Sequence, residues 1–279
     1  MKKRILYTVI LVLFTSLLSV SVTMVIVDSS GLPENFVQHK LKSQFLNETR
    51  RILVNLPANY DINKNYPVVY ILGGSTLTFN VSYDMNLLNR IGKSPEVIIV
   101  GLLNGDQKSR QRDLTPPFLK QDLDETNSPL GMADQYLKYI EEEVIPFMER
   151  NYKTNSERLL IGHSREGLFV TYSLIKKPEL FNGRIALSPA YWRENNKFVS
   201  HFNSYIKNIK SLNSYLFVSM GEKEVKKMKN AFDLMVKNIN NNKIEKFTFE
   251  SFYMPNATHS DNHILTAPIG IINYFNKNN

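Results

Sequence analysis

Cysteine is absent from this sequence of 279 residues, and histidine is scarce. Without cysteine the chain has no disulfide bond, thiol nucleophile or cysteine metal site. The histidines are spread along the sequence and form no dense cluster with aspartate or glutamate; they are His39, His163, His201, His259 and His263. We therefore expect neither a metal nor another cofactor.

Negative charge is in short supply, and the formal net charge is +8. The lysines are scattered rather than clustered, however. The densest run, "KEVKKMKN" at residues 223–230, is typical of a solvated helix face. Nucleic acid is therefore not an expected partner.

Only one long apolar run is present, at residues 5–27, and the basic residues Lys2, Lys3 and Arg4 precede it. Its 23 residues carry no charge, which is long enough to span a bilayer and longer than the usual core of a cleaved signal peptide. We expect a signal anchor in residues 1–27, with a cleaved signal peptide as the alternative. The basic flank predicts a single-pass protein of the cytoplasmic membrane whose C-terminal domain lies outside, periplasmic or extracellular. If the segment is cleaved, the domain is secreted.

Beyond the predicted anchor, residues 28–43 suit a tether and residues 44–279 suit one α/β domain. Strand patterns alternate there with helix patterns, which indicates a mostly parallel sheet with helices on both faces. Strands are predicted at residues 49–57, 66–74, 96–104, 158–162, 183–189, 214–221 and 246–255. Helices are predicted at residues 132–152, 166–178, 225–238 and 264–275. Pro146 predicts a kink or break in the first of these helices.

The motif "LLIGHSREGLF" at residues 159–169 carries the strongest chemical signal. Gly162-His163-Ser164 matches the first half of the Gly-x-Ser-x-Gly nucleophile elbow. The second half departs from it, because Glu166 stands where a small residue is expected and Gly167 comes one place late. A strand ending just before Ser164 and a helix beginning just after it would hold the hydroxyl at a helix N-terminus, which favours negative charge. A turn serine or a helix N-cap is the alternative interpretation.

A serine nucleophile needs a base that is oriented by a carboxylate. In α/β-hydrolases these groups follow the serine in the order acid, then histidine. His259 lies in the loop "MPNATHSDNHIL" and suits the base, whereas His263 suits a cap and His201 a helix face. Glu222 and Glu224 both follow a predicted strand, and at least one of them is an ordinary first-turn carboxylate of the next helix.

An oxyanion hole needs two N–H donors. The backbone of Arg165, directly after the serine, is the first candidate. The turn in "YILGGSTLTF" offers Gly74 and Ser75 as the second, because small residues let the backbone approach a substrate carbonyl. An ordinary glycine turn is the alternative.

Several stretches resemble the putative-esterase family often called esterase D-like, an α/β-hydrolase family, and in particular its ferric-siderophore esterase branch. They include "RRILVNLPANYDINKNYPVVYILGG", "RQRDLTPPF", "LLIGHSREGLFVTYSLIKKPELFNGRIALSPAYW", "LFVSMGEKE" and "NATHSDNH". Together they run in the family's order from about residue 50 to the C-terminus. The resemblance implies the α/β-hydrolase fold, with Ser164 as nucleophile, His259 as base and Glu224 as acid.

The resemblance also implies that Arg112 and Trp192 lie near a substrate pocket. An ion pair between Arg112 and Asp113 and a core position for Trp192 are the alternatives. The chain departs from the family at Gly73-Gly74, where Asp-Gly is usual, and at Glu166. We expect Glu166 to point outward or to open the turn slightly, and to place a carboxylate near the site.

The resulting hypothesis is a serine carboxylic-ester hydrolase that works through a Ser-His-Glu triad and an acyl-enzyme. A small-molecule ester is the expected partner, and siderophore lactones, acyl esters of sugars and small thioesters all remain open. One alternative is an inactive, membrane-tethered binding module, which the unusual Glu166 in the elbow favours. The other is an acyltransferase of the same fold. A peptidase has less support, since no propeller or large cap domain is indicated.

Overall fold

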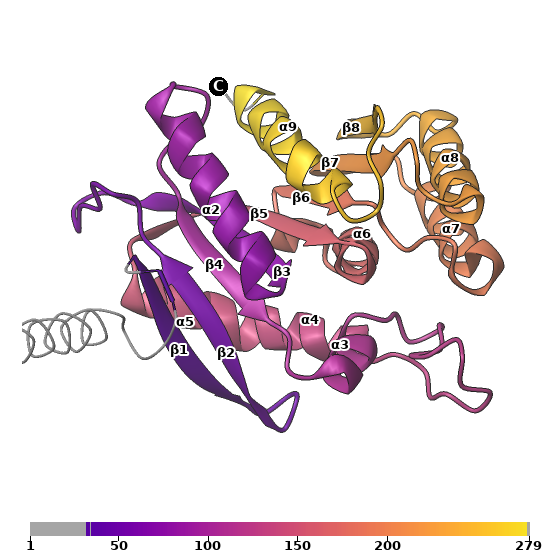
Figure 1. Ribbon diagram of the computed structural model, residues 1–279, viewed down its shortest axis with the longest axis horizontal. Helices are drawn as coiled ribbons and strands as arrows, with labels where there is room; N and C mark the ends of the chain where they lie inside the picture. Colours follow the sequence, from indigo (N-terminus) through magenta and orange to yellow (C-terminus); the bar gives the residue numbers. More distant parts are fainter. Residues whose placement is uncertain (1–31, 34, 278–279) are drawn as a thin grey trace, which may run out of the picture. The chain divides into compact units, whose positions relative to one another are not determined.

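The computed structural model describes residues 32–33 and 35–277 (Figure 1). The chain divides into a unit Met1–Phe36 and a unit Val37–Asn279, and the apolar core and the candidate site belong to the second unit. The predicted anchor at residues 5–27 lies outside the described residues. Among the residues that are described, no helix combines the length and the apolar character that crossing a membrane requires.

The described residues form a sheet of eight strands in the order β1-β2-β4-β3-β5-β6-β7-β8. The strands are β1 (Phe36–Ser43), β2 (Glu48–Asn55), β3 (Tyr66–Gly73), β4 (Ile98–Leu103), β5 (Thr154–His163), β6 (Gly183–Leu187), β7 (Ser211–Gly221) and β8 (Glu245–Met254). β2 runs antiparallel to β4, and every pair from β4 across to β8 is parallel. The predicted mostly parallel sheet is therefore confirmed. Its parallel strands end at one common edge, where ligands bind in open α/β sheets.

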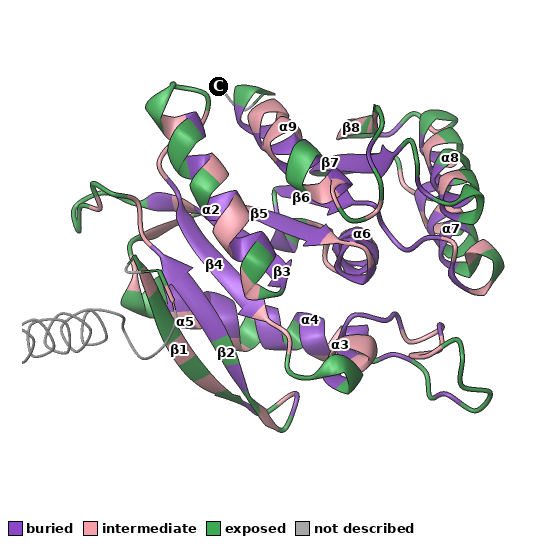
Figure 2. Ribbon diagram, viewed as in Figure 1, coloured by how far each residue is buried: buried purple, intermediate pink, exposed green. Residues whose placement is uncertain are grey.

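Helices cover both faces of this sheet (Figure 1). They are α2 (Ser75–Arg90), α3 (Gln107–Asp113), α4 (Ala133–Tyr139), the π-helical turn η1 (Ile140–Val144), α5 (Ile145–Asn151), α6 (Arg165–Lys176), the 3-10 turn η2 (Pro178–Leu180), α7 (Arg193–Ile206), α8 (Lys226–Asn240) and α9 (Asn262–Lys277). Figure 2 shows the strands of the sheet largely buried, while the helices are buried on one side and exposed on the other. α6, which follows the candidate nucleophile, is an exception, because its first ten residues are all buried.

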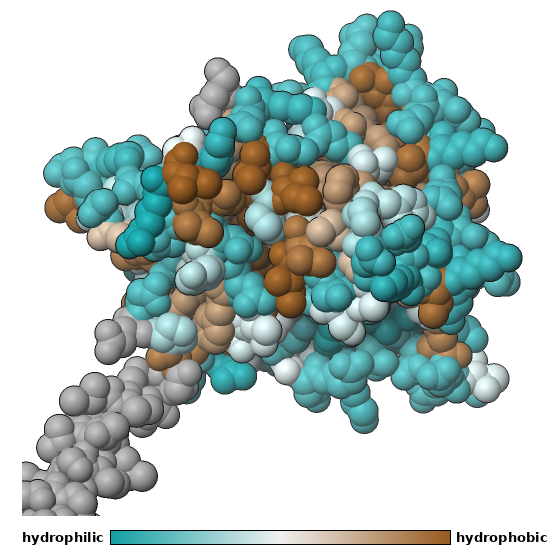
Figure 3. Space-filling model, turned by 45° about the horizontal axis from the view of Figure 1, so that its top comes forward, coloured by the Kyte–Doolittle hydropathy of each residue, from teal (hydrophilic) through white to brown (hydrophobic). Residues whose placement is uncertain are grey.

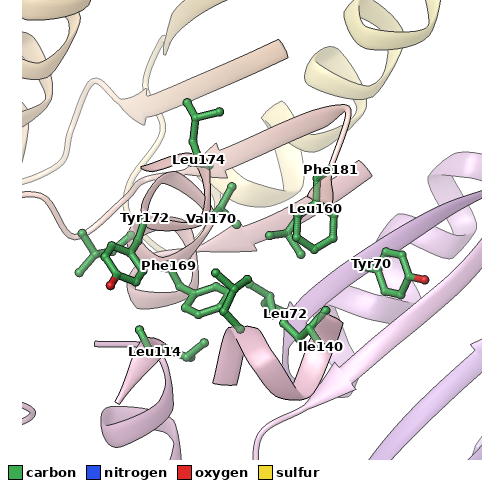
Figure 4. Packing of buried hydrophobic residues seen from close by; sticks show 14 of the residues in the cluster. Tyr70, Leu72, Leu114, Ile140, Leu160, Phe169, Val170, Tyr172, Leu174 and Phe181 are labelled. Atoms are coloured by element: carbon green, nitrogen blue, oxygen red, sulfur yellow. The ribbon is translucent and has the colours of Figure 1, made fainter. Parts of the chain in front are cut away.

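The alternation of side chains along the central strands builds an apolar cluster on each face of the sheet. In β3, Val69 and Ile71 join the cluster beneath α2 and α9, whereas Tyr70 and Leu72 join the opposite cluster. Figure 4 shows the second cluster, in which Leu72 and Leu160 from the sheet lie with Phe169 of α6 and Ile140 of η1. Successive residues of a strand point to opposite faces, so a strand buried on both sides is apolar throughout. This packing holds the ends of β3, β5 and β7 in fixed relative positions.

The long helix predicted at residues 132–152 forms as three consecutive segments, α4, η1 and α5. Pro146 has no N–H, and in a regular α-helix its ring clashes with the carbonyl four residues earlier. The chain accommodates the proline with one wider π-helical turn, Ile140–Val144, which Ile145 separates from Pro146. The predicted disruption at Pro146 is thus present.

The structure differs from the sequence prediction near the start of the domain. The expected tether, residues 28–43, contains β1 from Phe36 onward. β1 lies at the edge of the sheet and most of its residues are exposed or half-buried, so it lacks the strict apolar alternation that indicates a strand. The sequence prediction also gave no helix at residues 75–90, where α2 is found. α2 is rich in poor helix formers such as threonine and asparagine, and it packs through Leu77, Val81 and Met85.

Candidate active site

Ser164 occupies a sharp turn between the last residue of β5 and the first residue of α6. Its backbone has φ 60° and ψ −114°, a region that costs a non-glycine residue free energy and that persists mainly at functional sites. The backbone N–H of Ser164 donates to the carbonyl of Leu187 at 2.9 Å, which ties the turn to β6. Ser164 is at the N-cap position of α6, but its hydroxyl makes no capping bond to the helix.

His259 lies in the loop between β8 and α9 and contacts both of its predicted partners. Its Nε2 is 3.0 Å from Ser164 Oγ, and its Nδ1 is 2.9 Å from Glu224 Oε2. An ionised carboxylate only accepts hydrogen bonds, so Nδ1 carries the proton in this arrangement. Nε2 is then free to accept the hydrogen of the serine hydroxyl.

Glu224 is fully buried at its side chain and lies just after β7. Its second carboxylate oxygen accepts hydrogen bonds from Ser188 Oγ at 2.5 Å and from the backbone N–H of Gly221 at 2.9 Å. Burial alone would raise the pKa of Glu224, but the hydrogen bonds from His259, Ser188 and Gly221 outweigh burial and leave this pKa below its ordinary value. Glu224 is therefore held as an anion against the imidazole.

Glu222, the alternative acid, has a different environment. Its Oε2 accepts a hydrogen bond from the backbone N–H of Asn256 at 3.0 Å, and the residue is exposed. It thus braces the loop that carries His259, whereas Glu224 contacts the imidazole itself.

A second feature of the site is a stack of three imidazole rings, which the scattered histidines of the sequence did not indicate. The ring of His163 lies between those of His259 and His263, with centroids 4.5 Å and 4.3 Å apart. Burial is the main cause that lowers the pKa of His163 to about 3, and the nearby histidines and Arg110 add to it. Burial also lowers the pKa of His263. His163 is therefore an uncharged aromatic ring packed against the candidate base. In the sequence, its position beside Ser164 in the motif was the one signal that it belongs to the site.

The candidate oxyanion donors lie at helix N-termini. Arg165 is the first residue of α6 and Ser75 the first of α2, with Gly74 as its N-cap. The first N–H groups of a helix have no partner within it. Gly73 has φ +120°, a conformation that only glycine adopts readily, and its carbonyl accepts the backbone N–H of Asn104 at 3.1 Å. The turn therefore depends on Gly73, and its role in binding an oxyanion stays a prediction.

The side chain of Arg165 points away from the turn, toward the loop before α4. Its Nη1 donates to Thr115 Oγ1 at 2.7 Å and to the carbonyl of Gln121 at 2.8 Å. Arg193 donates to the same carbonyl at 3.2 Å and to that of Lys120 at 2.6 Å. These two guanidinium groups hold the loop against the start of α6 and α7.

Of the two alternatives expected for Glu166, an outward orientation is wrong, because its side chain is only 5% exposed. Its carboxylate accepts two hydrogen bonds from Arg110, at 2.7 and 2.6 Å, and one from Asn104 Nδ2 at 2.9 Å. The turn needs a glycine at position 162, because an added Cβ there would lie 2.7 Å from the backbone carbonyl carbon of Glu166 and 2.8 Å from its Cβ. This close approach involves atoms that any side chain at position 166 would have, so it is a feature of the elbow rather than of the glutamate.

The two residues predicted near a substrate pocket have separate settings. Arg112 donates to Glu48 at 2.7 Å and to Asp113 at 2.8 Å, which is the ion-pair alternative. Trp192 is half-buried, and the Nζ of Lys227 lies 3.8 Å from its ring centroid. It lines a hollow of about 500 Å³ together with Leu123 and Glu194. Contact of either residue with a substrate stays a prediction.

Comparison with known families adds a line of evidence that is independent of this geometry. The model of the family described as "Putative esterase" matches residues 43–262. The chain belongs to this esterase family. The resemblance drawn from the sequence motifs is thereby confirmed. The match begins within β1 and ends at the start of α9, so this esterase-family segment holds all three residues of the hydrogen-bonded chain.

Two relatives carry siderophore esterase names. Ferri-bacillibactin esterase BesA of Bacillus subtilis (strain 168) is 31% identical over 168 residues, which are 55% of this chain and 58% of that protein. The siderophore enterobactin esterase of Emericella nidulans is 32% identical over 127 residues, 41% of this chain and 42% of that protein. The esterase-family chain thus spans less than two thirds of the length of either relative.

Solved structures share the fold over most of the chain. An IroE-like serine hydrolase from Shewanella oneidensis superimposes with a TM-score of 0.79 at 25% identity, over 86% of this chain and 80% of that chain. The BES protein from Bacillus cereus gives a TM-score of 0.74 at 21% identity, over 86% of this chain and 96% of that one. The α/β architecture of this esterase-family member is therefore shared with solved structures, one of which is named a serine hydrolase.

Proposed function

We propose that this esterase-family chain hydrolyses carboxylic esters through Ser164, His259 and Glu224. The observation that carries the proposal is the unbroken hydrogen-bonded path from Ser164 Oγ through His259 to the buried carboxylate of Glu224. Such a path is what activates a hydroxyl, which is a weak nucleophile by itself.

In the proposed reaction Ser164 Oγ attacks the ester carbonyl carbon while His259 Nε2 takes the hydroxyl proton. Glu224 keeps the imidazole in the required tautomer and stabilises its positive charge. The backbone N–H groups of Arg165 and of the Gly74–Ser75 turn bind the oxyanion of the tetrahedral intermediate. His259 then protonates the leaving alcohol. In the second half of the reaction His259 takes a proton from a water molecule, which attacks the carbonyl of the acyl-enzyme. His259 returns this proton to Ser164 Oγ as the acid is released.

The substrate class that the relatives suggest is a siderophore ester. Their names include ferri-bacillibactin and enterobactin, which supports testing ferric siderophore lactones beside simple esters. A ferric ion would then be part of the substrate rather than a cofactor of the chain.

We also propose that the domain works outside the cytoplasmic membrane, held there by residues 1–27. The charge-free run at residues 5–27 behind three basic residues supports this position. Exposed apolar side chains on α2 and α9, among them Tyr83, Leu87 and Ile264, add support, because exposed apolar surface suits proximity to lipid. Figure 3 turns this side of the domain forward and shows apolar surface between hydrophilic regions.

The inactive alternative loses the observation that favoured it. The carboxylate of Glu166 accepts hydrogen bonds from Arg110 and Asn104, and Ser164 remains hydrogen-bonded to His259. A glutamate in the elbow is therefore compatible with the proposed chemistry.

The test is hydrolysis of p-nitrophenyl esters of increasing acyl length by the full chain in a mild detergent. Ser164→Ala and His259→Ala are compared with the unchanged protein, and a fluorophosphonate probe reports on activation of the serine. We expect hydrolysis and labelling that both substitutions abolish. Hydrolysis no faster than that of Ser164→Ala, together with no labelling, would refute the proposal. Acyl transfer to an added alcohol in place of water would favour the acyltransferase.

A further inference from the structure

Glu166 and Arg110 form a mostly buried ion pair at the start of the helix that follows the candidate nucleophile. The glutamate follows Ser164 by two residues on α6, and its two oxygens face Nε and Nη2 of Arg110 on α3. The carboxylate is almost completely buried, and the side chain of Arg110 is 26% exposed. A paired arrangement of this kind is strong and fixed in direction.

The pair lies beside the parts of the site where charge would develop. An added Cβ on Gly73 would be 3.6 Å from Glu166 Oε1, so the carboxylate lies against the turn that precedes Gly74 and Ser75. Burial dominates the lowered pKa of His163, yet the positive charge of Arg110 contributes to it. Arg110 is therefore within electrostatic reach of the imidazole stack.

Arg110 differs from the two other arginines of the site in its partner. In the part of the chain that the structure describes, the hydrogen bonds given by Arg165 and Arg193 go to a hydroxyl and to carbonyl oxygens. These acceptors are neutral, so neither guanidinium has a carboxylate in direct contact, although the negative charge of Asp122 reaches both of them. Of these three arginines, only Arg110 has a carboxylate in direct contact with its guanidinium, and that carboxylate comes from the residue that departs from the elbow motif.

We infer that Glu166 is a specificity-determining residue, because it cancels the charge of Arg110 beside the oxyanion turn and so keeps the site from favouring acyl groups that carry a negative charge. The inference rests on the proposed esterase function and concerns the choice among ester substrates. With a neutral residue at position 166, Arg110 would present an uncompensated positive charge to the bound acyl group. In a partly buried site such a charge acts over several ångströms with little screening.

The experiment compares two esters of similar size, p-nitrophenyl hexanoate and the mono-p-nitrophenyl ester of adipic acid, which carries a terminal carboxylate. The readout is the ratio of kcat/KM for the charged ester to that for the neutral ester. Glu166→Gln keeps the size and an accepting oxygen but removes the charge. We expect the ratio to rise by about tenfold.

A charge cycle separates this effect from a loss of packing. Arg110→Gln leaves Glu166 as the uncompensated charge, so the ratio should fall below that of the unchanged protein. The double variant Glu166→Gln/Arg110→Gln removes both charges and should return the ratio close to the starting value. Glu149→Gln is the matched control, because it breaks the Arg158–Glu149 pair and changes the net charge equally, away from the elbow; its ratio should not move.

An unchanged ratio in Glu166→Gln, with the hexanoate ester still hydrolysed, would overturn the inference and leave the proposed function intact. An equal rise in Glu149→Gln would overturn it as well, since net charge alone would then explain the effect. Absence of any Ser164-dependent hydrolysis would instead refute the proposed function, and the inference with it. If Glu166→Gln does not fold, the ratio of kcat/KM values in Arg110→Gln is compared with that in the double variant. Equal ratios in these two variants would overturn the inference.

Discussion

The imidazole of His163 lies against that of His259, with ring centroids 4.5 Å apart. Burial is the largest cause that lowers the pKa of His163 to about 3, whereas a histidine of the unfolded chain titrates near 6.5. Between these values the unfolded chain binds a proton that the folded chain does not. Stability contributed by His163 is thus fully present above about pH 6.5 and is lost as the pH falls toward 3.

We predict that His163→Phe, which keeps an aromatic ring but cannot titrate, weakens this acid dependence. The loss in the free energy of unfolding between pH 7 and pH 5 should be smaller than in the unchanged protein by about 2 kcal/mol. Urea unfolding at both pH values measures it. The same loss in both proteins would mean that His163 is already protonated in the folded state.

Substitution of the two candidate acids should give opposite results. In Glu224→Gln the amide can donate to His259 Nδ1 and so favours the wrong tautomer, and kcat should fall by about 10³ to 10⁴. Glu222→Gln should leave kcat close to that of the unchanged protein, because the carboxylate of Glu222 accepts from the backbone N–H of Asn256 and not from the imidazole. Steady-state kinetics with p-nitrophenyl butyrate decide the matter. A larger loss in Glu222→Gln would exchange the two assignments.

The oxyanion donor at the start of α2 can be removed without breaking the helix. Ser75 is the first residue of α2, a position that tolerates proline well because its N–H has no partner in the helix. We predict that Ser75→Pro lowers kcat by about 10² to 10³, while Ser75→Ala, which keeps the N–H, has little effect. Equal rates in the two variants would assign the second donor to Gly74 alone.

Arg112 belongs to a cluster of charges in which Asp113 also pairs with Arg50. Asp113 is almost fully buried, so removal of a partner leaves a buried charge less well compensated. We predict that Arg112→Gln lowers the free energy of unfolding by about 1–3 kcal/mol and leaves KM unchanged. A raised KM with unchanged stability would instead support the role in substrate binding that the family resemblance implies.

Much of the fold was predictable because buried strands are recognisable in the sequence as apolar runs. β3, β4 and the second half of β5 are short apolar runs, and each follows the pattern of a strand covered on both faces. β1 was not predictable, since an edge strand needs apolar side chains on neither face. α2 was missed for a related reason: its residues have low helix propensity, and packing against the sheet holds it in place.

The site was predictable in part, through chain order. Ser164 and His259 could be chosen because each follows a strand and their order fits a hydrolase. Glu222 and Glu224 fitted that order equally well, and the family resemblance pointed to Glu224. The structure joins Ser164, His259 and Glu224 by hydrogen bonds. Their catalytic roles stay predictions. The partners of Glu166 could not be chosen, since Arg110 lies 56 positions away on a helix that the pattern did not indicate.

The sequence by itself determined the alternation of the buried central strands with helices, the elbow and the family, because these depend on local patterns and short motifs. Only the tertiary structure decided which charges neutralise one another and which rings stack. Glu166 looked like a carboxylate added to the site, and its pairing with Arg110 makes it a compensating charge. The physical reason is that the effect of a buried charge depends on the groups around it in space, and the crossovers of a parallel sheet bring those groups together from distant parts of the chain.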